Sequence, residues 1–275
     1  MVQRYHINEM SQLNRRLLDP VSFFLQWRAY GKSCRVDPTQ TSHRQILDEL
    51  TSAGICVLEG YLDRDTVNRV WDEISDPLMK LRDGQEIPGL QGSRYPEYGN
   101  YVLHHAESHS KSVLPFMKDP MIQSIANAFA GGSGVSFDLR AELRSEAREN
   151  RLVDFWHADT WKFRFKAMLY LTDVTEENAP FRYLAGSHRS EPWPFRRFCL
   201  DYVSHAFQGQ DFKERYCFRE GERQRRDPLF REMICTAPAG TLILFDGRGL
   251  HSGTPLRKPP RMILNHTFVR QVDLL

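Results

Sequence analysis

The chain has 275 residues, of which 41% are hydrophobic and 26% are charged, as in ordinary globular proteins that fold in water. Its 37 Lys and Arg nearly balance its 35 Asp and Glu, and the resulting net charge of +2 argues against nucleic acid or a membrane surface as a partner. The length suffices for one large domain with its own core, and we expect a single domain over residues 1–275.

Cysteine usage and the first residues bear on the cellular compartment. An odd number of cysteines without CxxC spacing is typical of reduced thiols in the cytosol. Residues 1–18 are too polar for a signal peptide, and no apolar run reaches the roughly 18 residues that a spanning helix needs. We therefore expect a cytoplasmic protein, and the sequence leaves its oligomeric state open. The cysteines are Cys34, Cys56, Cys199, Cys217 and Cys235.

The first part of the chain, residues 1–132, is predicted to be mainly helical support. Three stretches space their apolar residues as a helix does, and each begins at a residue suited to capping. The helices are expected to begin at Ser42 (capping box, ending at Gly54), at Asp63, and at Asp119-Pro120 (ending at Gly131), with a short strand at 55–58.

From residue 133 onward the hydrophobic period becomes two, and turn residues separate short segments. Helices followed by many short strands favour a mainly β fold with flanking helices (α+β), built as an antiparallel double-sheet roll. Between residues 189 and 231 the strand pattern lapses, which predicts a lid or binding insertion. The expected strands are 135–144, 153–159, 163–172, 181–184, 233–236, 241–245 and 262–269.

A possible metal site combines His157, Asp159 and His251. On a strand, residues two apart share one face, so the imidazole of His157 and the carboxylate of Asp159 point at the same spot. His251 lies at another strand edge and can supply a third ligand from across the sheet or barrel. Two histidines and one carboxylate on one side of a metal leave three positions open, as a non-haem Fe(II) oxygenase requires.

Other polar residues favour structural roles. Asp246 sits at a turn that its carboxylate is expected to orient, and His266 alternates with apolar neighbours as a core group does. The run His104, His105 and His109 lacks the glutamate of an HExxH motif. We expect that run to form a loop or helix-start cluster.

Four fragments, in this order and spacing, resemble the phytanoyl-CoA dioxygenase family. The resemblance covers roughly residues 44–270 and implies a double-stranded β-helix (cupin-like jelly roll) that uses Fe(II), 2-oxoglutarate and O2. Carried over residue by residue, it implies that His157, Asp159 and His251 form the catalytic metal triad and that Arg261 holds the distal carboxylate of 2-oxoglutarate. The fragments are 46–62, 155–159 (FWHAD), 184–188 (LAGSH) and 239–253 (AGTLILFDGRGLHSG).

The sequence departs from the family pattern after the distal histidine. His251 and Arg261 are ten residues apart, where many members have eleven, and the small polar residues are Ser252 and Thr254. Either hydroxyl is a candidate for assisting the cosubstrate. Arg257 competes with Arg261 for the carboxylate, but it lies in a Pro-rich loop, whereas Arg261 begins a strand and can point into the barrel. Asp159 fills the position that halogenating relatives leave to chloride, which favours hydroxylation or another C–H oxidation.

Candidate substrate residues are less specific. Arg140, Glu142 and Arg144 share one strand face by their period of two, and a solvent face is the default interpretation. The functional interpretation places an arginine inside the barrel, on a carboxylate of substrate or cosubstrate. Trp161 is expected to pack, or else to line the substrate site. The arginine-rich stretch 189–231 is expected to be a solvated surface, or else a lid that recognises an anionic group.

The function that these features predict is an Fe(II)- and 2-oxoglutarate-dependent oxygenase. Its simplest reaction is hydroxylation of an unactivated C–H bond in a small metabolite or natural-product intermediate, with release of succinate and CO2. Three alternatives remain: desaturation or another C–H oxidation at the same site, a cupin-like metal-dependent isomerase or hydrolase, and a non-catalytic binding module on the same fold. The sequence identifies neither the substrate nor the position oxidised.

Overall fold

The computed structural model describes residues 43–85, 89, 91–132, 134–147, 155–159, 163–189 and 230–270. The described elements belong to one compact unit of residues 37–190 and 216–275, whereas a second unit, 1–36 with 191–215, lies outside the described residues. The predicted single domain therefore stays a prediction. Almost all of the predicted insertion 189–231 also lies outside the described residues.

Helices α2 and α3 largely follow the predicted pattern. Helix α2 (Arg44–Ala53) ends at Gly54, whose φ of 81° is left-handed and whose N–H bonds to the carbonyl of Leu50, as a glycine cap does. The predicted capping box was wrong, because the N-cap is His43 and no side chain caps the helix. Helix α3 (Arg64–Arg82) begins as expected, with the Asp63 carboxylate accepting a bond from the Thr66 N–H.

The next helical segments are α4 (Leu114–Met117) and α5 (Pro120–Phe129). Asp119 caps α5 by accepting from two backbone N–H groups, and Pro120 takes the first helical position, where its missing N–H costs nothing. Their buried faces pack against the sheet, with Phe116 against His266 and Phe129 against Phe165. No helix in the described part of the chain is both long and apolar enough to cross a bilayer.

The larger sheet has seven strands, all paired antiparallel. Its order across the sheet is β1 (Ile55–Leu58), β8 (Leu242–Asp246), β5 (Phe165–Tyr170), β10 (Arg261–Arg270), β4 (Gly134–Arg144), β3 (Asn100–His104) and β2 (Gly92–Tyr95). Most neighbours in the sheet are far apart in sequence, so distant residues meet on one surface.

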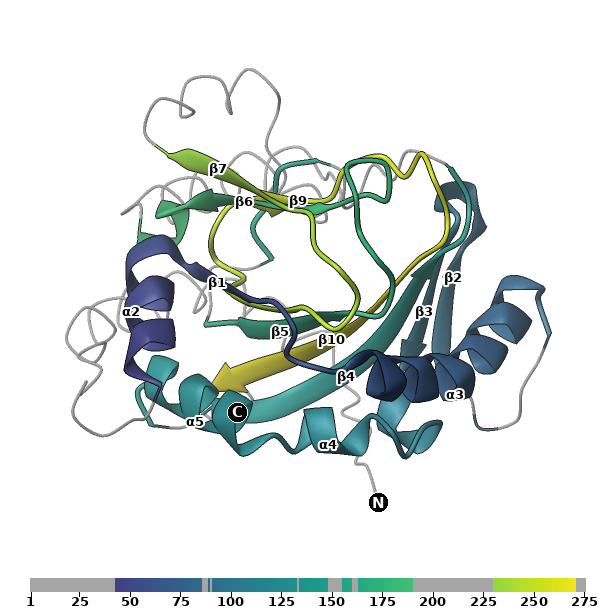
Figure 1. The fold of residues 1–275 in the computed structure, drawn as a ribbon, viewed down its shortest axis with the longest axis horizontal. Coiled ribbons are helices and arrows are strands. Elements are labelled where there is room, and N and C mark those ends of the chain that lie inside the picture. Colours follow the sequence, from purple (N-terminus) through teal and green to yellow (C-terminus); the bar gives the residue numbers. More distant parts are fainter. Residues whose placement is uncertain are drawn as a thin grey trace, which may run out of the picture. The chain divides into compact units, whose positions relative to one another are not determined.

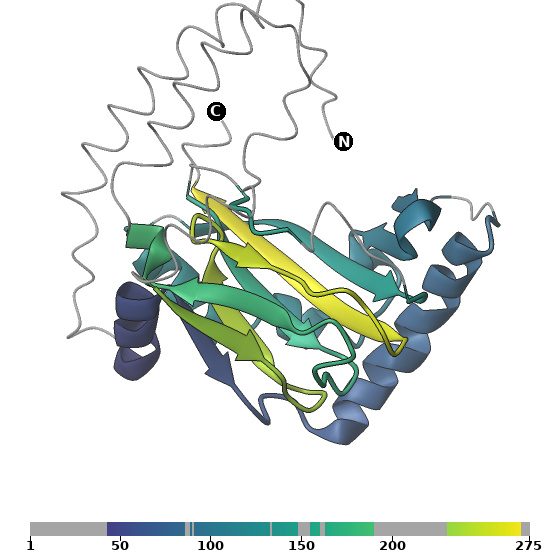
Figure 2. The same cartoon turned by 90° about the horizontal axis from the view of Figure 1, so that it is seen from above.

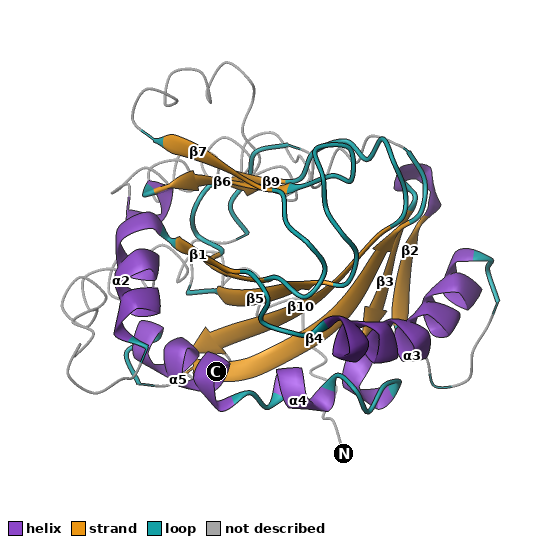
Figure 3. Ribbon diagram, viewed as in Figure 1, coloured by secondary structure: helices purple, strands orange, loops and turns teal. Residues whose placement is uncertain are grey.

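The smaller sheet has three strands, in the order β7 (Arg231–Cys235), β6 (Phe181–Ala185) and β9 (His251–Ser252). It faces the larger sheet from one side, while α3, α4 and α5 lie against the opposite side (Figure 1). Loops carry the chain repeatedly from one sheet to the other (Figure 3). Seen from above, α2 and α3 lie at opposite ends of the sheets (Figure 2). This is the mainly β jelly roll with flanking helices that the sequence predicts.

The space between the sheets holds an apolar core. Ile263 of β10 and Tyr170 of β5 pack there with Phe181 and Tyr183 of β6. Directly paired strand residues share a face, and so do residues two apart on one strand. The inner face of the larger sheet therefore also carries the register partners of these two residues and the residues two positions away. Three such residues matter below: Glu142 and Arg144 of β4, and Arg261 of β10.

No expected strand covers β2, β3 or the two-residue β9. Strands β2 and β3 lie within the part predicted to be mainly helical, and both join the larger sheet. The predicted strand 153–159 is wrong in its described part, where His157 forms only an isolated bridge. The other predicted strands are present, and each end lies within two residues of its expected position.

Candidate metal centre

The backbone holds His157 and His251 opposite each other in one antiparallel bridge. The N–H of His157 bonds to the carbonyl of His251 at 2.9 Å, and the reverse bond is also 2.9 Å. Such a reciprocal pair puts both side chains on one face. The ring centroids are accordingly 4.4 Å apart.

The Nδ1 atom of each imidazole forms a hydrogen bond with a backbone carbonyl oxygen. His157 Nδ1 lies 2.7 Å from the carbonyl oxygen of Phe155, and His251 Nδ1 lies 2.9 Å from that of Gly249. A carbonyl only accepts, so each Nδ1 carries the proton and each Nε2 keeps a lone pair for a metal. Burial, with the nearby His251, lowers the pKa of His157 to about 4. The imidazole is therefore neutral at pH 7, which is the form that binds metal.

Asp159 completes the cluster from the same segment. Its N–H bonds to the carbonyl of Gly247 at 2.8 Å, and its Oδ1 lies 3.6 Å from His251 Nε2. One ligand atom from each of His157, Asp159 and His251 lies within 4.8 Å of the other two. Burial alone would raise the pKa of Asp159, but Lys166 and His251 hold it well below its usual range. Two imidazoles and one ionised carboxylate thus converge on one point.

Lys166 of β5 was not anticipated. Its Nζ lies 2.7 Å from Asp159 Oδ2, and its side chain is only 14% exposed. The period of two along β5 puts Lys166 on the face of Met168 and Tyr170. That signal was present in the sequence, but only the strand pairing shows that this face is the inner one.

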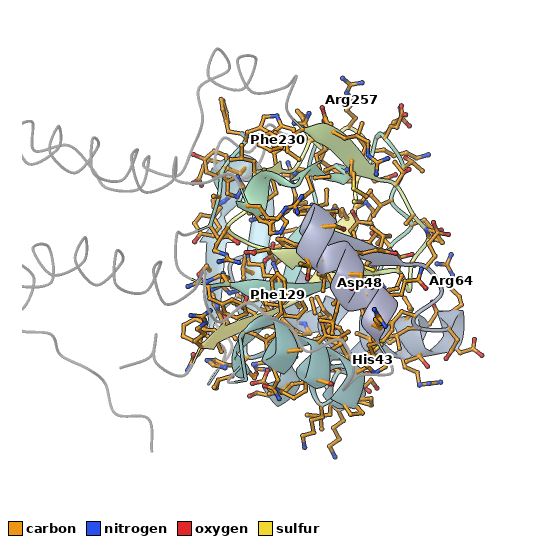
Figure 4. The ribbon with its side chains drawn as sticks, turned by 90° about the vertical axis from the view of Figure 1, so that its left-hand side faces the viewer. His43, Asp48, Arg64, Phe129, Phe230 and Arg257 are labelled. Atoms are coloured by element: carbon orange, nitrogen blue, oxygen red, sulfur yellow. The ribbon has the colours of Figure 1, made fainter. Side chains whose placement is uncertain are left out.

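Arg261 is the first residue of β10 and is 8% exposed. Its guanidinium lies over the Tyr170 ring, 5.8 Å from the centroid, and its Nη2 contacts the Met168 sulfur at 3.9 Å. Its Nε has no hydrogen-bond partner, and no acidic side chain in the described ranges pairs with it. The rival Arg257 is exposed and points away from the unit (Figure 4).

The charged residues of β4 face inward, so the default expectation of a solvent face is wrong for Arg144. Arg144 is 3% exposed and donates from Nη1 to the Thr254 carbonyl at 3.0 Å. Glu142 accepts from Asn265 Nδ2 at 3.4 Å. Arg140 is half-exposed and forms an ion pair with Asp138. The inner face of β4 is therefore polar and carries both signs of charge.

The two candidate hydroxyls differ in their surroundings. Ser252 is fully buried, and its Oγ finds no hydrogen-bond partner within the described segments. It pairs with Arg182 while His251 pairs with Tyr183, so Ser252 faces away from the His251 side chain. Thr254 lies beside Arg144, which is in register with Arg261. Trp161 lies outside the described residues.

The remaining polar candidates have structural partners. The Asp246 carboxylate binds the backbone N–H and the guanidinium of Arg248, and so orients its turn as expected. His266 is fully buried, with Nε2 2.8 Å from Ser136 Oγ. His104 ends β3 and His105 adopts a left-handed conformation before a short turn. Within the described ranges, the only metal-competent group is the one formed with His251.

A family model described as phytanoyl-CoA dioxygenase (PhyH) matches residues 50–259. A search of curated protein sequences gives no match for the chain.

Three similar solved structures illustrate the fold. EctD from S. alaskensis, with 2-oxoglutarate and 5-hydroxyectoine, has a TM-score of 0.62 at 17% identity over 84% of this chain and 76% of that one. The epimerase SnoN, in complex with Fe3+, alpha ketoglutarate and a nogalamycin compound, has 0.60 at 17% over 85% of each chain. HygX from Streptomyces hygroscopicus, with nickel, 2-oxoglutarate and hygromycin B, has 0.56 at 13% over 83% and 87%.

Proposed function

Because the chain belongs to the phytanoyl-CoA dioxygenase family, we propose that it is an Fe(II)- and 2-oxoglutarate-dependent oxygenase. The proposed reaction is hydroxylation of an unactivated C–H bond in a small polar metabolite, with release of succinate and CO2. The observation that carries the proposal is the convergence of His157, Asp159 and His251, whose ligand atoms lie within 4.8 Å of one another. This donor set suits Fe(II) and leaves three coordination positions open.

When bound, Fe(II) and 2-oxoglutarate supply the oxidising chemistry, and the protein contributes orientation and electrostatics. His157 and His251 would hold the ion through Nε2, because their Nδ1 atoms already bond to Phe155 and Gly249. Asp159 would add the third ligand as an ionised carboxylate. No ligand has to move far, since the backbone bridge between the two histidines fixes their spacing.

Arg261 would bind the distal carboxylate of 2-oxoglutarate. A guanidinium offers a two-pronged fork to a carboxylate, and that of Arg261 has no acidic partner in the described ranges. The Tyr170 ring beneath it holds the guanidinium in place. Of the two hydroxyls, we favour Thr254 over Ser252, because Thr254 lies beside Arg144, the register partner of Arg261.

The polar side chains on the inner face of β4 favour a polar substrate. Arg140 and Arg144 offer positive charge to an anionic group, while Glu142 and Asn265 offer hydrogen-bonding atoms on the same face. Trp161 and the insertion 189–231 remain predictions for the substrate side. A cytoplasmic location is also part of the proposal, supported by Cys56 and Cys235, which are buried free thiols as in proteins of reducing compartments.

The test is anaerobic titration of the purified chain with Fe(II) and 2-oxoglutarate, followed by succinate assays with candidate polar metabolites. The expected results are a weak visible charge-transfer band and substrate-dependent succinate release, with both lost in Asp159→Ala. The matched control is Asp48→Ala, which removes an exposed carboxylate of α2 (Figure 4).

The same assays separate the alternatives. A chain that binds Zn(II) and ignores 2-oxoglutarate would be a metal-dependent isomerase or hydrolase. Binding of both without any turnover would indicate a non-catalytic module. Mass analysis of the product separates hydroxylation from desaturation, and from the epimerase and carbocyclase reactions named for the similar structures SnoN and SnoK.

A further inference from the structure

Lys166 is a largely but not fully buried cation beside the metal triad. Its ammonium lies 2.7 Å from Asp159 Oδ2, and the two side chains are 14% and 18% exposed. The ammonium also lies 5.7 Å from the Phe245 ring centroid. Lysines on strands usually extend into water, and exposed ion pairs contribute little. Lys166 instead sits where water screens its charge poorly, so its pull on Asp159 is stronger than that of a surface lysine.

The two oxygens of Asp159 face different groups. Oδ1 lies 3.6 Å from His251 Nε2, on the side of the ligand cluster, whereas Oδ2 lies against Lys166. Gly247 lies close to the same carboxylate and leaves room for it, because a Cβ on that residue would lie 2.7 Å from Oδ2. In this arrangement one oxygen, Oδ1, is directed at His251, and the other, Oδ2, contacts Lys166.

We propose that Lys166 is a positioning residue that makes Asp159 bind the metal through Oδ1 alone. A carboxylate can bind a metal through one oxygen or two. Binding through both oxygens would occupy one of the three positions that 2-oxoglutarate and O2 require. By holding Oδ2, Lys166 keeps that position open and orients the ligand. This inference rests on the proposed metal site.

Lys166 could instead weaken metal binding, so the direction of the change in affinity distinguishes the two roles. An ammonium beside a metal site repels a divalent cation and competes for the same carboxylate. If competition dominated, removing the ammonium would tighten metal binding. If positioning dominates, removing it weakens binding, because groups that orient metal ligands typically change affinity by about 10- to 100-fold when lost.

The experiment titrates the full-length, metal-free chain with Co(II) alone, without oxygen, and records the dissociation constant and the visible spectrum. Lys166→Met keeps the length of the side chain but removes the charge, and Lys166→Arg restores it. The matched control is Lys80→Met, which removes an exposed ammonium 2.6 Å from Asp76, a carboxylate that is no ligand.

We expect Lys166→Met to raise the Co(II) dissociation constant by about 10- to 100-fold and to shift the visible bands, since the number of bound carboxylate oxygens changes. Lys166→Arg should recover most of the affinity, and Lys80→Met should match the wild type. Circular dichroism verifies folding, and Lys166→Gln replaces Lys166→Met if the latter does not fold.

Two results would overturn the inference. Unchanged or tighter Co(II) binding by Lys166→Met, with wild-type bands, would show that the ammonium does not orient Asp159. Failure of the wild-type chain to bind Co(II) would refute the metal site itself, and with it the proposed function. Normal wild-type binding together with an unaffected Lys166→Met refutes the positioning role alone.

Discussion

Replacing Arg261 by Met should weaken 2-oxoglutarate binding and, in the same protein, raise stability when no 2-oxoglutarate is present. Arg261 is 8% exposed, its Nε has no hydrogen-bond partner among the described residues, and its register partner on β4 is a second arginine, Arg144. A buried cation without an acidic partner, beside a like charge, costs folding energy. Met fills a similar volume without that cost.

The magnitudes follow from the groups involved. Two charge-assisted hydrogen bonds to a carboxylate contribute about 3–4 kcal/mol, which is roughly a 100- to 1000-fold rise in the dissociation constant. Removing the unsatisfied Nε and the charge opposite Arg144 in the register should stabilise the ligand-free chain by about 1–3 kcal/mol. The loss of the Tyr170 contact, 5.8 Å from the ring centroid, offsets about 0.5–1 kcal/mol of that gain.

The assay pairs urea unfolding of the ligand-free protein with anaerobic 2-oxoglutarate titration of the Fe(II)-loaded protein. Arg257→Met, on an exposed loop, serves as the control and should change neither quantity. An Arg261→Met protein that binds 2-oxoglutarate normally would refute the anchor, and so would a larger loss of affinity in Arg257→Met. A less stable ligand-free Arg261→Met would refute the energetic reasoning.

Three further predictions concern neighbouring features. Gly247→Ala places a Cβ 2.7 Å from Asp159 Oδ2, so Co(II) affinity should fall while circular dichroism stays native; wild-type affinity would contradict the crowding. Burial lowers the pKa of His266 to about 4. As the pH falls from about 6.5 to 4, His266 is therefore protonated in the unfolded chain before it is protonated in the folded protein, and the free energy of unfolding decreases. The expected decrease is about 2 kcal/mol between pH 7 and pH 5. Urea unfolding should show no such decrease in His266→Gln. Tyr170→Phe removes the hydroxyl that donates to the Cys235 carbonyl and accepts from the Phe181 N–H. Unfolding should then become easier by about 2–4 kcal/mol with 2-oxoglutarate affinity retained; a parallel loss of affinity would mean that the hydroxyl, rather than the ring, serves Arg261.

Most strands could be predicted from the sequence because one face of each is polar or because turn residues bound it. Strands β2 and β3 could not. Strand β2 reads Gly-Ser-Arg-Tyr and has no apolar alternation, while β3 contains the continuous run Tyr101–Leu103, whose spacing fits a buried helix as well as a strand. The pairing of β3 with β4, which adds β2 at the edge of the sheet, depends on contacts between distant segments that local patterns do not encode.

The candidate metal site could be predicted from spacing, whereas its surroundings could not. A period of two shows that Arg140 and Arg144 share a face, but not which face is buried. Lys166 looks like a solvent residue until β5 is paired with β8 and β10. The pairing places Lys166 on the inner face, where its ammonium contacts Asp159. Contacts of this kind follow from register, which the hydrophobic pattern specifies only when one face is clearly apolar.

Strand β5 connects the two ends of the proposed cosubstrate site. Lys166 at one end contacts Asp159, and Tyr170, four residues later on the same face, lies beneath Arg261. A strand advances about 3.3 Å per residue and resists stretching. Strand β5 therefore fixes the distance between the proposed metal site and Arg261. The rigid backbone of β5 would then determine which length of dicarboxylate fits the site. A one-residue insertion between Lys166 and Tyr170 would turn one of these two side chains to the outer face of the sheet.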